Sequence, residues 1–91
     1  MNIKFSGKDD VRSEALEELC EKKLAKIAGK VPSDNLSADV NFSLESKDHV
    51  LTIKLFVDGD NYLAKAKGQD MYKNIDDCVE KLKTQIMKNK R

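Results

Sequence analysis

The residues on which catalysis and metal binding depend are scarce in this sequence. Its 91 residues include one histidine, two cysteines and no tryptophan. The histidine, His49, lies in a polar stretch, and no serine–histidine–aspartate, cysteine–histidine or metal-ligand set can be assembled around it. Gly59 and Gly68 do not form a phosphate-binding loop. We therefore expect a protein that is not an enzyme and that carries no metal or other cofactor.

Long apolar runs are missing as well. No stretch approaches the ~18–20 apolar residues of a membrane-spanning helix, and the start of the chain, MNIKFSGKDD, lacks the apolar segment of a signal peptide. Cys20 and Cys78 have no metal-type spacing, and both fall on or near the apolar side of helical patterns. Free core thiols in a reducing cytosol are the simplest interpretation, and a disulfide or redox switch is the alternative. We expect a cytoplasmic protein without a membrane partner.

What the sequence does contain is the composition of a globular domain. Hydrophobic residues make up 40% of it and charged residues 36%, with only one proline and four glycines. A chain of this length buries roughly 60–65% of the surface that its unfolded form exposes, which is enough for one modest core. We expect residues 1–91 to form a single domain.

Apolar and polar residues alternate in four short stretches, a pattern typical of strands with one buried face. These strands are expected at residues 1–6, 38–44, 51–57 and 62–67. Helical periodicity marks residues 13–28 and the stretch that follows Asp70. The resulting order, β-α-β-β-β-α, predicts an α+β fold in which a four-stranded sheet carries both helices on one face.

The ends of the two helices carry their own signals. Asp10 or Ser13 can cap the first helix, and Asp70 can cap the second. Gly29 is expected to end the first helix, and Pro32 prevents it from resuming. The apolar side of the first helix is expected to hold Ala15, Leu16, Leu19, Cys20, Leu24 and Ile27. The apolar side of the second is expected to hold Met71, Tyr72, Ile75, Val79, Leu82 and Ile86.

Two hairpin loops are expected between the last three strands. The polar stretch from Glu45 to His49 joins the second strand to the third. The sequence Asp58-Gly59-Asp60-Asn61 joins the third to the fourth, with a positive φ at Gly59.

The net charge of +1 conceals an uneven distribution. Residues 65–91 hold eight positive and four negative side chains, whereas residues 31–64 hold two positive and six negative ones. A charge distribution that is polarised in this way steers association with a charged partner.

The charges of the first helix separate onto two flanks when the residues are placed at ~100° intervals. The acidic flank consists of Glu14, Glu17, Glu18 and Glu21. The basic flank consists of Arg12, Lys22, Lys23, Lys26 and Lys30. The helix dipole orders charges along the axis, so it does not account for opposite flanks.

The last helix carries a basic stripe opposite its apolar side. The stripe consists of Lys81, Thr84, Lys88 and Arg91, with Lys73 near it. Lys65 and Lys67 share one face of the preceding strand. A lysine-rich solvated surface is one interpretation, and a surface that binds phosphates is the other. Because aromatic residues are few, base stacking is poorly supported, and phosphate contacts to structured RNA fit the sequence better.

The stretches KGQDMYKNIDDCVEKLKTQIMKNK, SEALEELCEKKLAKI and MNIKFSG together resemble the ribosome hibernation-promoting factor and protein Y family over nearly the whole chain. The last helix, with its Asp-Met-Tyr, Ile-Asp and Lys-Leu pattern, is the most specific part. The resemblance implies a fold related to double-stranded-RNA-binding domains. It also implies binding to the small ribosomal subunit, in the channel used by messenger RNA and transfer RNA, where a bound factor inhibits translation and preserves idle ribosomes under stress and in stationary phase.

The resemblance also implies which basic residues meet ribosomal RNA. The family's basic helix positions correspond here to Lys23, Lys26, Lys81 and Lys88. Glu17 and Thr84 stand where the family often has arginine, which makes Lys22 and Lys83 plausible substitutes. With the other exposed cations, the candidate RNA-binding residues are Lys22, Lys23, Lys26, Lys30, Lys65, Lys67, Lys81, Lys83, Lys88 and Arg91.

The expected partner is the small ribosomal subunit with its ribosomal RNA, with no small-molecule substrate, and the free protein is expected to be a monomer. One alternative is a generic double-stranded-RNA-binding domain, although such domains begin with a helix. Another is a protein-interaction module that uses the open face of the sheet. The sequence lacks the linker and second domain of long family members, so a short form is expected, and a truncated long form would look the same. Pairing of ribosomes and stabilisation of single ones both stay open.

Overall fold

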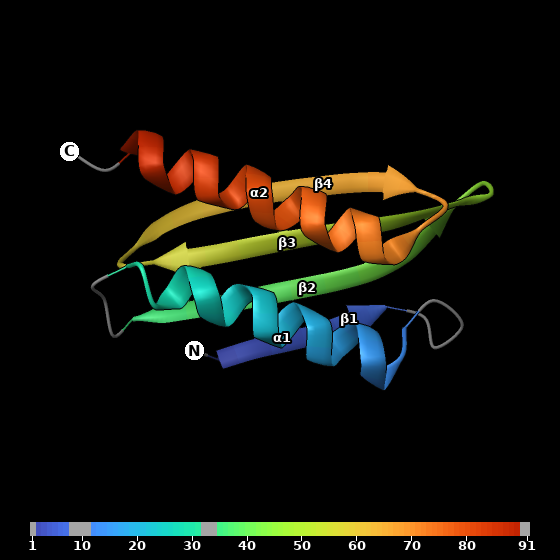
Figure 1. Ribbon diagram of the computed structural model, residues 1–91, viewed down its shortest axis with the longest axis horizontal. Coiled ribbons are helices and arrows are strands. Elements are labelled where there is room, and N and C mark those ends of the chain that lie inside the picture. Colours follow the sequence, from blue (N-terminus) through green and yellow to red (C-terminus); the bar gives the residue numbers. More distant parts are fainter. Residues whose placement is uncertain (1, 8–11, 32–34, 90–91) are drawn as a thin grey trace.

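The computed structural model describes residues 2–7, 12–31 and 35–89. Within these ranges the chain forms a strand, a helix, three strands and a helix (Figure 1). The elements are β1 (Asn2–Gly7), α1 (Glu14–Ala28), β2 (Leu36–Glu45), β3 (Asp48–Val57), β4 (Asp60–Gly68) and α2 (Met71–Asn89). The predicted order is confirmed, and every strand is longer than or offset from its predicted range because polar residues at the strand ends also pair.

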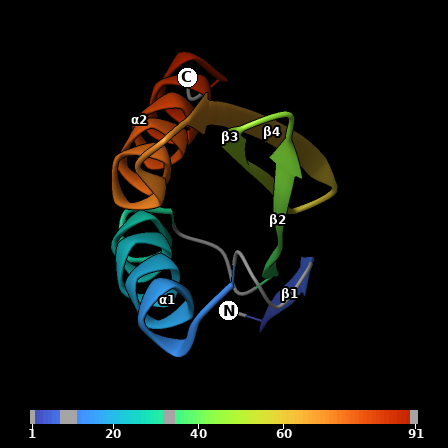
Figure 2. The same ribbon diagram turned by 90° about the vertical axis from the view of Figure 1, so that its right-hand side faces the viewer.

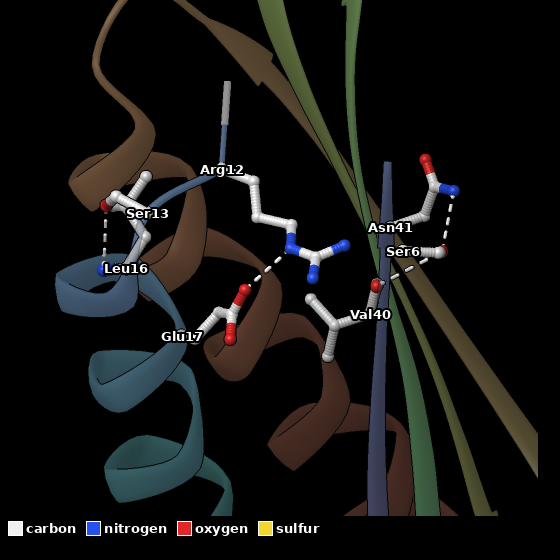
Figure 3. Close-up of polar contacts among 7 residues, drawn as sticks. All are labelled: Ser6, Arg12, Ser13, Leu16, Glu17, Val40 and Asn41. Atoms are coloured by element: carbon white, nitrogen blue, oxygen red, sulfur yellow. Dashed lines mark hydrogen bonds and ion pairs between the residues drawn. The ribbon is translucent and has the colours of Figure 1, made fainter. Parts of the chain in front are cut away.

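The four strands form one sheet in the order β1-β2-β3-β4. β1 is parallel to β2, since α1 crosses over between them, and the other neighbours are antiparallel hairpin pairs. Ser6 of β1 supports this register, because its Oγ donates to Val40 O at 3.5 Å and accepts from Asn41 Nδ2 at 2.9 Å (Figure 3). Both helices cover the same face of the sheet (Figure 2), so the predicted α+β architecture is confirmed.

Both hairpin turns are shorter than predicted. The turn between β2 and β3 is only Ser46 and Lys47, with Ser46 at a φ of 58°. His49 therefore lies within β3, paired with Leu44, and its predicted place in a loop was wrong. The polarity of the segment was misleading, because residues at this end of the sheet are half-exposed and need not be apolar.

The turn between β3 and β4 consists of Asp58 and Gly59, at φ values of 49° and 88°. Two successive positive φ values are typical of the tight turns that match the twist of a β-hairpin. The positive φ at Gly59 was predicted correctly, but Asp60 and Asn61 belong to β4 rather than to the turn.

The predicted N-caps of both helices are confirmed. Ser13 Oγ accepts a hydrogen bond from Leu16 N at 3.2 Å at the start of α1 (Figure 3). Asp70 Oδ1 accepts one from Tyr72 N at 3.0 Å at the start of α2. Each bond satisfies a backbone donor that the first helical turn leaves unpaired. Gly29 caps the end of α1, whereas Asp10 and Pro32 lie outside the described residues.

The core lies between the helices and the face of the sheet beneath them. It includes Leu24, Phe42, Leu51, Ile53, Leu55, Ile75 and Leu82, all fully buried. Cys20 and Cys78 are free thiols in this core, as the simplest sequence interpretation expected. In the part of the chain that the structure describes, neither helix is long and apolar enough to cross a membrane.

Two residues predicted on the apolar sides of the helices are exposed, and Leu16, Leu19 and Ile86 are partly buried. Ala15 is exposed, and the side chain of Tyr72 is 53% exposed. Tyr72 lies ~100° around the helix from Met71, whereas Ile75 and Leu82 lie within ~40° of it. A polar residue, Asn74, takes a buried position instead, where its Nδ2 donates to His49 O at 3.1 Å and to Gly68 O at 3.3 Å.

Candidate nucleic-acid interface

The two helices lie side by side with their N-termini at the same end of the molecule (Figure 1). Lys23 and Lys26 of the basic flank of α1 face α2 across a groove, which we call the inter-helix groove. It has a cavity volume of about 320 Å³. Its charged residues are Lys23, Lys26, Asp76, Glu80 and Lys83. Three of the predicted RNA-binding lysines, contributed by both helices, are thus brought together.

Two carboxylates of α2 orient these lysines. Lys23 Nζ lies 2.9 Å from Asp76 Oδ1, and Lys83 Nζ lies 3.6 Å from Glu80 Oε1. The lysine side chains are 32% and 30% exposed and the carboxylates 58% and 73%, so water screens both pairs. Such pairs contribute only about 0–1 kcal/mol to stability. These weak contacts orient Lys23 and Lys83 in the free protein. A phosphate can replace the carboxylate in either pair.

A second group of lysines lies at the outer edge of the sheet, and we call it the β4-edge cluster. It consists of Lys65, Lys67 and Lys81. Lys65 and Lys67 project from β4 toward Glu45, with Nζ atoms 3.9 Å and 3.8 Å from its carboxylate oxygens. Lys81 of α2 donates from Nζ to Lys65 O at 2.7 Å.

Lys81 and Lys83 point to opposite sides of α2. Two residues correspond to ~200° of rotation around a helix, so one side chain faces β4 and the other faces α1. The sequence pattern placed Lys81 on the main basic stripe and treated Lys83 as a substitute. In the structure Lys83 is the residue that joins the lysines of α1, and Lys81 contacts the backbone of β4.

The remaining candidates are dispersed. Lys22, Lys30 and Lys88 are exposed on the helices or just after them, and Arg91 lies outside the described residues. Thr84, which stands at a frequently basic family position, donates from Oγ1 to Glu80 O at 3.0 Å within its own helix. Of the predicted stripe Lys81, Thr84, Lys88 and Arg91, the part that the structure describes therefore contains two cations, Lys81 and Lys88.

Arg12 and Glu17 form a pair that the flank assignment did not foresee. Arg12 Nε donates to Glu17 Oε2 at 2.6 Å, across the start of α1 (Figure 3). Arg12 therefore belongs to the acidic side of α1 rather than to the lysine flank. The positioning carboxylates Asp76 and Glu80 were also missed, because their role depends on how α1 and α2 pack rather than on their spacing in the sequence.

Among the described residues, no group of three or more His, Cys, Asp or Glu side chains that could hold a metal ion accompanies these lysines. A four-stranded sheet with two helices on one face, and lysines from both helices in the groove between them, defines a small α+β domain with a lysine-lined groove between its helices. The family described as "Sigma 54 modulation protein / S30EA ribosomal protein" matches residues 3–91, and the chain belongs to this family.

Named relatives agree with this assignment. The chain is 33% identical over 90 residues to the ribosome hibernation promoting factor of Escherichia coli K12, covering 99% of this chain and 94% of that protein. The ribosome hibernation promoting factor of Salmonella typhimurium LT2 is 32% identical over 90 residues. The family resemblance seen in the sequence is thereby confirmed.

Solved structures share the fold. The N-terminal domain of Thermus thermophilus Protein Y is 30% identical, with a TM-score of 0.87 over 99% of this chain and 100% of that one. A ribosomal subunit interface protein from Coxiella burnetii is 29% identical, with a TM-score of 0.80 over 98% and 97% of the two chains.

Proposed function

We propose that this protein is a ribosome hibernation factor that binds the small ribosomal subunit. It occupies the channel used by messenger RNA and transfer RNA, inhibits translation and preserves inactive ribosomes in the cytoplasm. The family and the names of the relatives support the association with ribosomes. The structural observation that carries the proposal is the convergence of Lys23, Lys26 and Lys83 on one groove.

Binding through this groove follows from simple electrostatics. Lysine ammonium groups neutralise phosphates regardless of base sequence, and they release the counterions that those phosphates had condensed. Asp76 and Glu80 keep two of the ammonium groups at the groove while the protein is free. An RNA backbone that enters the groove exchanges these screened carboxylate contacts for phosphate contacts, so little is lost when the ion pairs break.

Lys22, Lys30, Lys65, Lys67, Lys81, Lys88 and Arg91 complete the proposed RNA-facing residues. The six of these that the structure describes do not line the groove. Lys65 and Lys67 lie on the open face of the sheet, because they alternate with the buried Ala64 and Ala66. We assign the whole set a supporting, long-range role. Lys65 and Lys67 share Glu45 as a partner, which reduces the positive potential of the β4-edge cluster. The protein has no proposed substrate or cofactor, and its inhibition of translation is steric rather than catalytic.

The proposal is tested by sedimenting the protein with purified small subunits on sucrose gradients at increasing salt. Three phosphate contacts in the groove predict a log–log salt slope of magnitude ~2–3, and the surrounding lysines make it steeper. Co-sedimentation that does not change between low and high salt would contradict the proposal. Binding to free RNA duplexes that equals binding to the subunit would favour a generic double-stranded-RNA-binding domain instead.

A further inference from the structure

A second hollow lies at the head of the inter-helix groove, between the first turns of α1 and α2 and the start of β3. Its volume is about 490 Å³, which lies within the range of about 300–1,000 Å³ that small-molecule sites occupy. We call it the head pocket. Its polar and aromatic lining comes from Arg12, Ser13, His49, Gln69, Asp70 and Tyr72.

Tyr72 is the most unusual residue of the head pocket. Its side chain is 53% exposed, although the sequence pattern assigned it to the core. The N-cap fixes its backbone, because Tyr72 N donates to Asp70 Oδ1 at 3.0 Å. An aromatic ring that is exposed on a well-anchored helical turn offers a flat apolar surface at little further entropic cost. Such a surface suits a planar ligand. It makes base stacking possible at one position, although the scarcity of aromatic residues in the sequence had argued against stacking.

His49 adds an unsatisfied polar group to the same pocket. Its Nδ1 is buried and has no hydrogen-bond partner among the described residues. Buried polar atoms are nearly always paired, so an exception calls for a ligand or a water molecule. Ser13 adds a hydroxyl that accepts from Leu16 N and still has its own hydrogen to donate. The pocket thus combines an aromatic face with the Ser13 hydroxyl, which can meet the edge of a planar ring. His49 Nδ1 is closed to solvent and can bond a ligand only if its ring turns.

The head pocket and the inter-helix groove lie along the same side of α2. Tyr72, Asp76 and Lys83 lie within ~40° of one another around α2, so all three face α1. Tyr72 precedes Asp76 by one helical turn, and Asp76 holds Lys23 at 2.9 Å. Eleven residues separate Tyr72 from Lys83, a distance of ~16 Å along the helix. A chain of phosphates along the lysines would therefore bring a base to the pocket.

We propose that the head pocket receives one unpaired base of an RNA strand, which stacks on Tyr72 while neighbouring phosphates contact the lysines of the groove. This inference rests on the proposed function and specifies the feature of RNA that the protein selects. The occupant is an RNA base rather than a peptide side chain, because three lysines of the neighbouring groove, Lys23, Lys26 and Lys83, outnumber its two carboxylates and favour a polyanion. Stacking on an aromatic ring tolerates any base, since every base has a π-face.

The test uses an RNA hairpin with one unpaired 2-aminopurine and the same hairpin fully paired. The wild-type protein should bind the first hairpin more tightly and quench its 2-aminopurine fluorescence. Loss of base–aromatic stacking weakens binding ~10-fold or more, so Tyr72→Ala should lower the affinity for the unpaired hairpin by this factor and abolish quenching. Tyr72→Phe keeps the ring and should retain both properties.

Met87→Ala is the matched control, because Met87 is 73% exposed on the same helix and does not line the pocket. It should bind like the wild type. Unquenched fluorescence with the wild-type protein, or equal affinities of the wild type and Tyr72→Ala, would overturn the inference. If either result is found and the wild-type protein still co-sediments with small subunits, only the base-binding pocket is disproved. If co-sedimentation is also absent, the proposed function is disproved as well.

Discussion

At the scale of single residues, the two cysteines show how burial controls chemistry. Burial raises the pKa of Cys20 to about 12, with smaller contributions from Cys78, Glu17 and Glu21. Burial also raises the pKa of Cys78 to about 11, although Lys81 acts in the opposite direction. A thiol must be ionised to act as a nucleophile. Both thiols are therefore unreactive for two reasons: they are buried away from reagents, and they stay in the neutral form.

We predict that native protein at pH 8 reacts with a thiol reagent only as fast as it unfolds, whereas denatured protein reacts at both cysteines at once. Because both folded pKa values lie above the ordinary value of 9.0, the stability that the neutral thiols provide is complete below pH 9. It declines as the pH rises toward 11–12. Urea melts of the wild type and a Cys20→Ala/Cys78→Ala variant should diverge in this range.

Equal alkaline losses in the two proteins would contradict this assignment, because the two proteins differ only at the two cysteines. Rapid labelling of the native protein would contradict it independently.

The sequence predicted the two helix caps correctly but misplaced two other residues, Tyr72 and His49. Ser13 and Asp70 were identified as caps because capping depends on a few neighbouring backbone groups, which the local sequence determines. Tyr72 and His49 were misplaced because their burial depends on how α1, α2 and β3 meet. An apolar residue at the margin of a helical stripe is buried only if a neighbouring element reaches it, and α1 does not cover Tyr72.

At the scale of elements, α2 protects the edge of the sheet while it forms part of the core. Its side chains Lys81 and Gln85, one turn apart, donate to Lys65 O at 2.7 Å and to Leu63 O at 2.8 Å. These carbonyls belong to an edge strand, and unpaired edge groups invite association with another strand. The lysine stripe of α2 therefore has a structural component that the sequence pattern alone attributed to RNA binding.

The apolar face of α2 should be the element whose loss damages the fold most directly. Leu82 is fully buried between α2 and the sheet, and replacing a buried leucine by alanine costs ~2–5 kcal/mol. For a domain of this size each kcal/mol lowers the melting temperature by ~4–8 °C, so Leu82→Ala should lower it by ~10 °C or more. Met87→Ala on the exposed side of the same helix should leave it nearly unchanged. Equal melting temperatures for the two variants would show that the apolar face was misassigned.

The arrangement of elements was more predictable than the arrangement of side chains between them. The alternation of apolar and polar residues in the strands and the helical periodicity of apolar residues predicted the β-α-β-β-β-α order. Each element buries one face, so its apolar residues recur with the period of that element. The groove was predictable only in part. The basic flank of α1 could be derived from its own residues, but the partner of that flank on α2 depended on the rotation of α2 about its axis.

At the scale of the whole molecule, neither layer of the fold carries an excess of charge. α1 holds three lysines and four carboxylates, α2 holds four lysines and three carboxylates, and the four strands hold four of each. The charge asymmetry along the sequence is therefore not an asymmetry between the helices and the sheet. A local group of lysines, rather than the overall field, is expected to decide which surface an RNA partner meets.

The final prediction separates local contacts from this overall field, using three double variants that each lower the net charge by two. Lys23→Gln/Lys83→Gln removes two of the three groove lysines. Lys81→Gln/Lys88→Gln changes the outer side of α2, and Lys47→Gln/Lys54→Gln changes the turn and open face of the sheet. Every site is a surface lysine, and glutamine at position 81 can still donate to the backbone of β4, as Gln85 does. All three proteins should remain folded.

In co-sedimentation with small subunits, the groove variant should lose the most affinity and lower the magnitude of the salt slope by ~2, one unit for each phosphate contact removed. The outer-side variant should lose less, because Lys81 and Lys88 act over a longer distance, and the sheet variant should change binding less than several-fold. Equal losses in all three would show that net charge alone governs binding. A dominant loss in the sheet variant would place the partner on the open face and favour a protein-interaction module over an RNA-binding domain.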